Sequence, residues 1–160
     1  MSSTPDPRYS LVIPAYNEER RIVSFFDTIH NFDGELIVVC DGTDATADVV
    51  EQIAHQRTDL VIRCLRFKKR LGKGGGVIAR LATARAPRVG YVDADGSTGI
   101  DELKRRFSLL GAYDGVFGSR WVPGSHPHGT KGGTPSTVPK GVPPFIHSFP
   151  ADVRTPSLLF

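Results

Sequence analysis

The chain has 160 residues, of which 39% are hydrophobic and 23% charged, as is typical of a single soluble globular domain. Its formal net charge of +3 is mild and no long basic stripe with interleaved aromatic residues occurs, which argues against a nucleic-acid-binding protein. No apolar run approaches the ~20 residues of a membrane helix, and residues 1–8 lack the apolar core of a signal peptide.

The two cysteines also bear on the class of protein. Cys40 and Cys64 both fall in apolar, strand-like runs, where a free cysteine behaves as a small hydrophobic residue. Neither a CxxC pair nor a spacing typical of metal ligands occurs. The sequence therefore predicts a reduced protein of the cytoplasm, acting there or at the inner face of the cell membrane.

Short apolar runs alternate with segments of helical periodicity from residue 9 to residue 118. The first predicted strand, Tyr9–Ile13, ends at Pro14, and Asp44 or Thr43 is placed to cap the second helix. Residues 98–101 have the form of a capping box and open a last helix that runs to residue 110. The other strands are expected at residues 35–40, 60–65, 89–92 and 115–118, and the other helices at residues 18–30, 45–56 and 74–84.

This alternation predicts an α/β fold with a parallel sheet, because the strands are too continuously apolar to be half-exposed. Ligands of such sheets bind at the carboxyl ends of the strands. The unusual polar clusters all follow predicted strands, at residues 14–18, 41–44, 68–76 and 93–95. We therefore expect these clusters to share one rim of the sheet and to form a binding site there.

Two carboxylates one residue apart, Asp93 and Asp95, follow the apolar run Arg88–Val92. On a continuing strand they would share one face and repel each other, whereas a turn at Gly96 lets both converge on one cation. Hard divalent ions take carboxylate oxygens and often keep substrate phosphates among their other ligands. The pattern favours a metal–diphosphate site, and a solvated acidic turn is the alternative.

A glycine-rich loop at residues 72–76 carries Lys73. It lacks the Lys-Ser/Thr ending of a Walker A motif, and Val77 stands where GxGxxG has its third glycine. This argues against a P-loop ATPase and a Rossmann hydride-transfer enzyme. The loop is either a cationic cradle for a sugar or diphosphate or a hinge. The basic stretch Arg63–Lys73 is either a clamp for phosphates or a membrane surface, or a solvated loop.

Two other polar residues stand at the ends of predicted strands. Asp41 ends the second apolar run, where acids accept hydrogen bonds from a base or from ribose hydroxyls, and Asp44 fits a helix cap better. Arg120 follows the fifth strand, where it would either neutralise phosphate or lie on the surface as an ordinary arginine.

The composition changes after Trp121. Residues 122–160 hold eight of the twelve prolines and a single acid, Asp152. Proline at this density does not support packed elements. The sequence thus predicts a disordered N-terminus over residues 1–8, a packed domain over residues 9–121 and an irregular tail over residues 122–160. The abrupt change suggests a frameshift or a truncated gene.

Taken together, five segments resemble the family 2 glycosyltransferases, which have the GT-A fold, a Rossmann-like and mainly parallel sheet flanked by helices. The dolichol-phosphate mannose or glucose synthase-like branch is the most similar. The resemblance implies that residues 9–121 bind a nucleotide sugar and that the C-terminal part of the fold is incomplete. The matching segments, in order and spacing, are residues 12–19, 37–46, 72–75, 93–97 and 118–120.

The resemblance also implies roles for single residues. Asp93 and Asp95 would form the DXD motif that holds Mg²⁺ or Mn²⁺ on the donor diphosphate, with Ser97 assisting. Lys73 would lie near the sugar or diphosphate, and Arg120 near the phosphates of donor or acceptor. Asp95 and Arg120 are the candidate catalytic residues, since the metal and the cations stabilise the departing nucleoside diphosphate. The residues expected to line the base and ribose pocket are Pro14, Tyr16, Glu18 and Asp41.

The implied reaction moves a sugar, with inversion by single displacement, from a nucleotide-diphosphate sugar to a polyprenyl (dolichyl) phosphate or a saccharide. A polyprenyl phosphate is already anionic near neutral pH and needs no general base. Two departures stand out: Cys40 replaces the first of two aspartates found in many members, and the tail replaces the usual acceptor region, where Asp152 has no motif context.

Two alternatives to an active glycosyltransferase follow from the same residues. An inactive nucleotide-sugar-binding remnant of such an enzyme would keep the donor rim without the acceptor region. Nucleotidyl transfer also uses a metal-bound diphosphate, but its glycine-rich loop usually follows the first strand, where residues 14–18 stand here.

Overall fold

The structure, a computed structural model, describes residues 7–70, 83–113, 115–116 and 157–159. Within these residues the helices are α1 (Arg21–Thr28), α2 (Thr46–Gln56) and α4 (Ile100–Leu109). The helix expected at residues 74–84 lies outside them except for its last two positions. The strands are β1 (Tyr9–Ala15), β2 (Gly34–Cys40), β3 (Val61–Arg66), β4 (Arg88–Tyr91), β5 (Gly115–Val116) and β6 (Ser157–Leu159).

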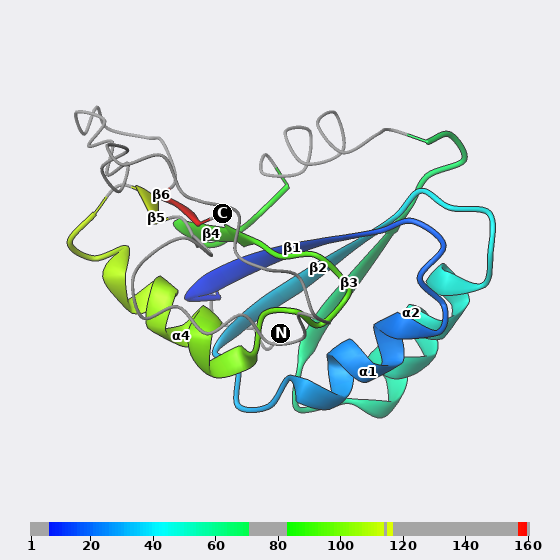
Figure 1. The fold of residues 1–160 in the computed structure, drawn as a ribbon, viewed down its shortest axis with the longest axis horizontal. Helices are drawn as coiled ribbons and strands as arrows, with labels where there is room; N and C mark the ends of the chain where they lie inside the picture. Colours follow the sequence, from blue (N-terminus) through cyan, green and yellow to red (C-terminus); the bar gives the residue numbers. More distant parts are fainter. Residues whose placement is uncertain (1–6, 71–82, 114, 117–156, 160) are drawn as a thin grey trace, which may run out of the picture.

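The described strands form one sheet in the order β3-β2-β1-β4-β6-β5, and every neighbouring pair is parallel (Figure 1). β1 and β2 pair along their whole length, from Tyr9 opposite Gly34 to Ala15 opposite Cys40. Parallel neighbours need a crossover, and α1 and α2 provide those from β1 to β2 and from β2 to β3. The α/β fold with a parallel sheet, expected from the sequence, is confirmed.

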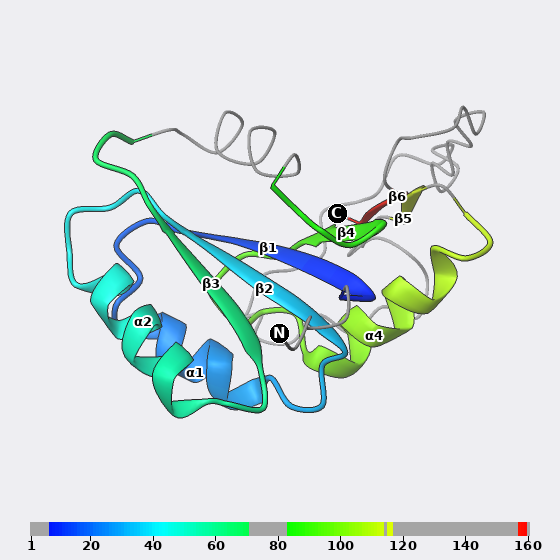
Figure 2. The same cartoon turned by 180° about the vertical axis from the view of Figure 1, so that it is seen from behind.

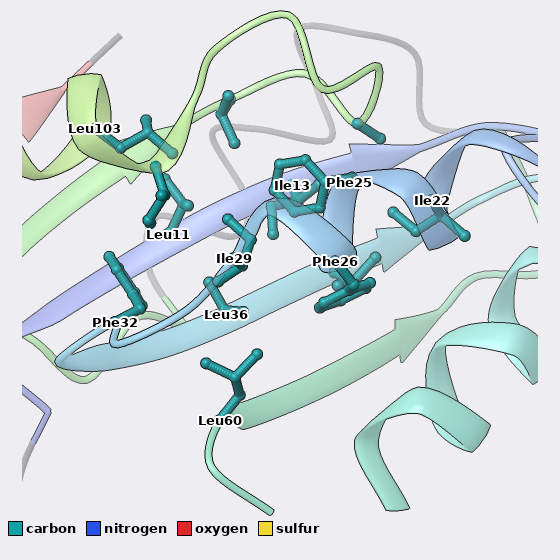
Figure 3. Packing of buried hydrophobic residues seen from close by; sticks show 14 of the residues in the cluster. Leu11, Ile13, Ile22, Phe25, Phe26, Ile29, Phe32, Leu36, Leu60 and Leu103 are labelled. Carbon is teal, nitrogen blue, oxygen red and sulfur yellow. The ribbon is translucent and has the colours of Figure 1, made fainter. Parts of the chain in front are cut away.

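Alternate residues of the central strands point to opposite faces of the sheet. One face packs against α1, α2 and α4, as Figures 2 and 3 show. The opposite face is buried as well, which agrees with a sheet covered on both sides. The core under the helices includes Leu11, Ile13, Ile22, Phe25, Phe26, Leu36, Val38, Leu103 and Phe107, and the opposite core Val12, Ile37, Val39 and Val89.

β1 continues through Pro14 to Ala15, so the prediction that Pro14 ends this strand is wrong. Pro14 lies opposite Val39 of β2, and on its other side β4 pairs with β1 only as far as Val12. The Val12 carbonyl faces β4, since it accepts the Val92 N–H at 3.1 Å. Pro14 is two residues further along and therefore faces the same side as Val12. Proline has no N–H, but β4 has ended at this level, so no hydrogen bond of the sheet is lost.

Each of the three described helices begins later than its sequence pattern predicts, α2 by a single residue, at Thr46. α1 begins at Arg21 rather than at residue 18, because Asn17 has a left-handed backbone (φ 54°) and the next two N–H groups donate to the side chains of Thr46 and Asp44. α4 has Gly99 as its N-cap and no side-chain cap bond. The capping box expected from Thr98 is therefore wrong, because Thr98 lies one residue outside the helix.

One buried carboxylate holds the amino ends of the strands together. Glu35 is 0% exposed, and its Oε1 accepts hydrogen bonds from the Ser10 hydroxyl (2.7 Å) and the Arg85 N–H (2.8 Å). The guanidinium groups of Arg63 and Arg85 each lie 3.0 Å from its Oε2. Burial alone would raise the pKa of Glu35, but these hydrogen bonds together hold it below its usual value. Glu35 thus joins β1, β2, β3 and the segment before β4.

The chain leaves β4 through a tight turn at Gly96. This glycine has φ +71°, a left-handed conformation that side chains with a Cβ rarely adopt. The Ser97 N–H donates to Asp95 Oδ1 at 2.9 Å and closes the turn. The turn at Gly96 expected from the sequence is confirmed.

β6 comes from the segment that the composition sets apart, and its backbone pairs with β4 on one side and β5 on the other. The domain boundaries at residues 8 and 121 stay predictions. Among the described residues no helix is both long and apolar enough to cross a membrane.

Replacing Glu35 by glutamine should lower the free energy of unfolding by about 2 kcal/mol at neutral pH, because the amide cannot pair with two guanidinium groups. The pKa of Glu35 is lowered in the folded state, so its stabilisation is present above the unfolded pKa of about 4.3 and is lost as pH falls through the folded value. In urea unfolding, the gap between wild type and variant should therefore shrink in acid.

Glu51→Gln is the matched control, because Glu51 also pairs with an arginine, Arg66 at 2.7 Å, but its side chain is 49% exposed. It should change stability little. Equal losses in the two variants would contradict the role given to burial.

Gly96→Ala should destabilise the protein by about 1 kcal/mol, because alanine must adopt a left-handed backbone there. Nothing lies within 4 Å of the added Cβ, so crowding contributes nothing. Gly111→Ala is the control: its backbone is not left-handed and an added Cβ would meet only ordinary contacts, the nearest at 3.7 Å, so its stability should not fall below that of the wild type. Thermal unfolding of both variants checks this, and an equal loss at both positions would rule out the backbone explanation.

Candidate functional site

Four loops follow the strands β3, β2, β1 and β4 on one side of the sheet, because parallel strands in this order have their carboxyl ends on one edge. We call this edge the rim; it comprises residues 67–70, 41–45, 16–20 and 92–99 (Figure 2). Phe67 N–H donates to the Cys40 carbonyl at 2.8 Å, and Val92 N–H to the Val12 carbonyl at 3.1 Å. The structure thus brings together, within the described residues, the polar clusters that the sequence pattern places on one edge.

The loops after β1 and β2 are joined through the side chain of Asn17. Its Oδ1 accepts hydrogen bonds from the Thr43 N–H (2.9 Å) and the Asp44 N–H (3.3 Å). Sequence reasoning did not single out Asn17 as a site residue. The available signal was its residue type, since asparagine is enriched several-fold in the left-handed conformation that it adopts here.

Bonds in both directions complete this junction. Glu19 Oε2 accepts the Ala45 N–H at 3.2 Å, while Asp44 Oδ2 accepts the Glu19 N–H at 3.3 Å. The Thr46 hydroxyl accepts the Glu18 N–H at 2.8 Å. We call these contacts between residues 17–19 and 43–46 the rim clamp. They cross 25 or more residues of sequence, so the clamp depends on the register of β1 and β2.

The rim clamp also occupies the amino end of α2. Its N-cap is Ala45, and the Thr46 N–H donates to Asp44 Oδ1 at 3.0 Å, which resembles the capping role expected for Asp44. Burial would raise the pKa of Asp44, but hydrogen bonds from Thr46 and Glu19 hold it below its usual value. An anionic carboxylate and donors already in use leave this helix end poorly suited to a phosphate, although free helix amino ends bind phosphate well.

The residues expected in a base and ribose pocket lie near the rim clamp. Tyr16 is 42% exposed, and the Arg70 guanidinium lies over its ring at 4.2 Å from the centroid. Asp41 is partly buried directly after β2, and Pro14 lies inside β1. The Glu18 carboxylate is engaged by Arg21 at 2.6 Å. Their roles toward a ligand stay predictions.

The two acids after β4 lie beside one tyrosine. Asp93 Oδ1 accepts the Tyr91 hydroxyl at 2.8 Å. Burial raises the pKa of Tyr91, and so do this hydrogen bond and the negative charges of Asp93 and Asp95. Both carboxylates therefore lie within electrostatic reach of the same hydroxyl, and the turn at Gly96 follows them directly.

Carboxylate oxygens fit a hard divalent ion such as Mg²⁺ or Mn²⁺. Within the described part of the chain, no group of three or more acids, histidines and cysteines is placed to hold a metal. A cation at Asp93 and Asp95 has room for further oxygen ligands, such as those of a substrate. This donor set suits an ion shared with a diphosphate.

The basic residues expected at the site divide into three groups. Lys73 and Arg120 lie outside the described residues. Arg63 pairs with Glu35 at the opposite end of the sheet, so it takes no part in a phosphate clamp at the rim. Arg66 pairs with Asp48 and Glu51 of α2, both at 2.7 Å. The prediction of a phosphate clamp or membrane surface over residues 63–73 is therefore wrong for Arg63, and for the rest of the stretch it stays a prediction.

Comparisons with known proteins agree with this geometry. A family model described as Glycosyl transferase family 2 matches residues 10–151. The chain is 34% identical over 110 residues to the dolichyl-phosphate beta-glucosyltransferase of Drosophila melanogaster. The matched region covers 61% of this chain and 34% of that relative. This chain spans about a third of the length of the curated relatives that it matches.

Solved structures match the fold. A mannosyltransferase of Pyrobaculum calidifontis in complex with GDP-Man and Mn²⁺ has a TM-score of 0.52 at 30% identity, over 57% of this chain and 28% of that chain. S. aureus TarS in complex with UDP-GlcNAc has a TM-score of 0.57 at 22% identity, over 78% of this chain and 37% of that chain, which shows the shared fold. The sheet and its helices are thus those of the GT-A fold.

The family match reaches 30 residues beyond Trp121, into the segment with the changed composition. A frameshift or truncation as the origin of that segment stays a prediction. Because the family model matches well over half of the residues and the sheet has the arrangement of the matching solved structures, the chain belongs to glycosyl transferase family 2.

Proposed function

We propose that this chain carries the donor-binding part of an inverting glycosyltransferase that moves a sugar from a nucleoside-diphosphate sugar to a polyprenyl (dolichyl) phosphate. Family membership and a relative named as a dolichyl-phosphate beta-glucosyltransferase support the reaction and the acceptor. The mannosyltransferase with GDP-Man and Mn²⁺ supports a nucleotide-sugar donor and a divalent ion. The reaction would take place at the cytoplasmic face of a membrane, where a lipid acceptor lies.

The observation that carries the proposal is the division of the rim into two halves. After β1 and β2, the exposed Tyr16 ring and the Asp41 carboxylate offer a stacking face and a hydrogen-bond acceptor, which suit a base and a ribose. The Arg70 guanidinium now covers the ring, so a base would stack on its outer side or displace it. After β4, Asp93 and Asp95 repel a bare diphosphate and suit one that arrives with a cation.

The occupied amino end of α2 supports the same division. In many nucleotide-binding folds a helix amino end takes the phosphates. Here the N–H groups at residues 43–46 already donate to side chains of the rim clamp. The diphosphate would therefore lie toward β4, where Asp93, Asp95 and Ser97 would hold Mg²⁺ or Mn²⁺ against it, with Lys73 nearby.

The chemistry follows from charge. In the single displacement, an anionic oxygen of the acceptor phosphate forms a bond to the sugar's anomeric carbon as the bond from that carbon to the donor phosphate breaks. The departing nucleoside diphosphate gains negative charge, which a divalent ion, when bound, stabilises as a Lewis acid. Asp95 contributes by holding that ion, and Arg120 by its own charge. No general base is needed, because the acceptor carries no proton that must be removed.

Asp95→Asn should abolish the effect of Mn²⁺ on nucleotide binding. In the wild type, calorimetry with UDP or GDP should show tighter binding when Mn²⁺ is present. The variant should lose at least the ~10–100-fold in metal affinity that removal of an outer-shell partner costs, since Asp95 would contact the ion directly. Asp101→Asn, an exposed acid in the first turn of α4, is the control and should behave as the wild type. Metal-independent binding in the wild type would refute the cation site.

A transfer assay separates the enzyme from the inactive remnant. The 160-residue chain is incubated with Mn²⁺, dolichyl phosphate and either UDP-glucose or GDP-mannose, and the lipid product is measured. An active enzyme should yield dolichyl-phosphate sugar from one donor, and Asp95→Asn should yield none above background. Donor binding without any product would support the alternative, a nucleotide-sugar-binding remnant.

A further inference from the structure

We propose that Asn17 is a positioning residue for the nucleoside half of the donor site: its side-chain oxygen fixes the loop after β2 so that the Asp41 carboxylate stands at the rim. This inference rests on the proposed function, because it assigns Asp41 to the donor. It adds a residue that does not touch the nucleotide and acts through the loop that carries Asp41.

Asp41 lies between two fixed points of the chain. On one side is Cys40, the last residue of β2, which lies opposite Ala15 in β1 and whose carbonyl accepts the Phe67 N–H at 2.8 Å. On the other side is Thr43, whose N–H donates to Asn17 Oδ1 at 2.9 Å. Only Asp41 and Gly42 lie between these two residues, so the position of the Asp41 backbone, and with it the start of its side chain, depends on the bond at Thr43.

Gly42 is packed against the same asparagine. A Cβ added to Gly42 would lie 2.4 Å from Asn17 Oδ1 and 2.7 Å from Asn17 N. Real Cβ atoms do not approach other atoms this closely, so only glycine allows the two loops to lie together. Asn17 and Gly42 therefore pack against each other, and Asp41 is the residue that precedes Gly42 in the chain.

The two roles of Asn17 can be separated. Its backbone is left-handed, with φ 54°, which glycine adopts freely and asparagine better than most residues. Its Oδ1 accepts two neighbouring N–H groups, which aspartate can also do. Asn17→Gly thus keeps the backbone and removes the acceptor, whereas Asn17→Asp keeps the acceptor. If the acceptor positions Asp41, the first variant should lose nucleotide affinity and the second should recover most of it.

The test measures nucleotide binding to the full 160-residue chain by calorimetry, with UMP, UDP, GMP and GDP, each with and without Mn²⁺. For the base that the wild type binds, Asn17→Gly should weaken the monophosphate and the diphosphate by the same factor, about tenfold for two lost hydrogen bonds. The ratio of affinities with and without Mn²⁺ should stay as in the wild type, because Asp93 and Asp95 lie in the loop after β4, which Asn17 does not contact through any of these bonds. Asn17→Asp should restore at least half of the lost binding free energy.

Arg57→Ala is the matched control for stability. Arg57 donates to the carbonyls of Phe26 (3.1 Å) and Ile29 (2.7 Å) and so ties α2 to the end of α1, away from the rim. This variant should unfold at a lower temperature and bind nucleotide as tightly as the wild type. A lower stability in Asn17→Gly would reduce the number of binding sites per chain, whereas loss of positioning changes the affinity of each site.

The outcomes separate the inference from the proposed function. If the wild type binds neither base, both are overturned. If the wild type binds but Asn17→Gly binds equally well, only the inference is overturned. The same holds if the loss in Asn17→Gly is confined to Mn²⁺-dependent binding, or if Asn17→Asp fails to recover affinity.

Discussion

The register of β1 against β2 is the constraint on which the rest of the structure depends. The two strands pair from Tyr9 with Gly34 to Ala15 with Cys40. A slip of one residue would turn Leu11 and Ile13 out of the core under the helices, because side chains alternate between the faces. It would also move the rim clamp by about 3.3 Å, which is enough to break its hydrogen bonds. One register therefore serves the core and both ends of the sheet.

The carboxylates at the two ends of these strands differ in burial. At the amino ends, Glu35 is wholly buried and is neutralised by Arg63 and Arg85. At the carboxyl ends, the acids after β2 and β4 stay partly or largely exposed. A buried, paired carboxylate stabilises the fold, whereas acids at an accessible edge can meet a ligand.

Within the rim, the rim clamp lies after β1 and β2, and the turn at Gly96 lies after β4. The clamp uses the N–H groups that precede and open α2, which removes a common phosphate site. After β4, the Tyr91 hydroxyl donates to Asp93, and the negative charges of Asp93 and Asp95 both raise the pKa of Tyr91. A nucleoside toward β2 and a metal-bound diphosphate toward β4 is the arrangement of a donor that these two features favour.

The sequence by itself determined the parallel sheet and its single polar edge, since apolar runs and helical periods are local and parallel strands must end together. It also predicted the turn after Asp95, because glycine at position 96 can adopt the left-handed backbone that the turn requires. The sequence alone did not predict the contacts between segments that are far apart in the chain. Pro14 continues β1 only because β4 has already ended. Arg63 reaches Glu35, and Asn17 reaches Thr43, across 26 or more residues. Such pairings depend on the register of strands packed side by side, which only the tertiary structure decides.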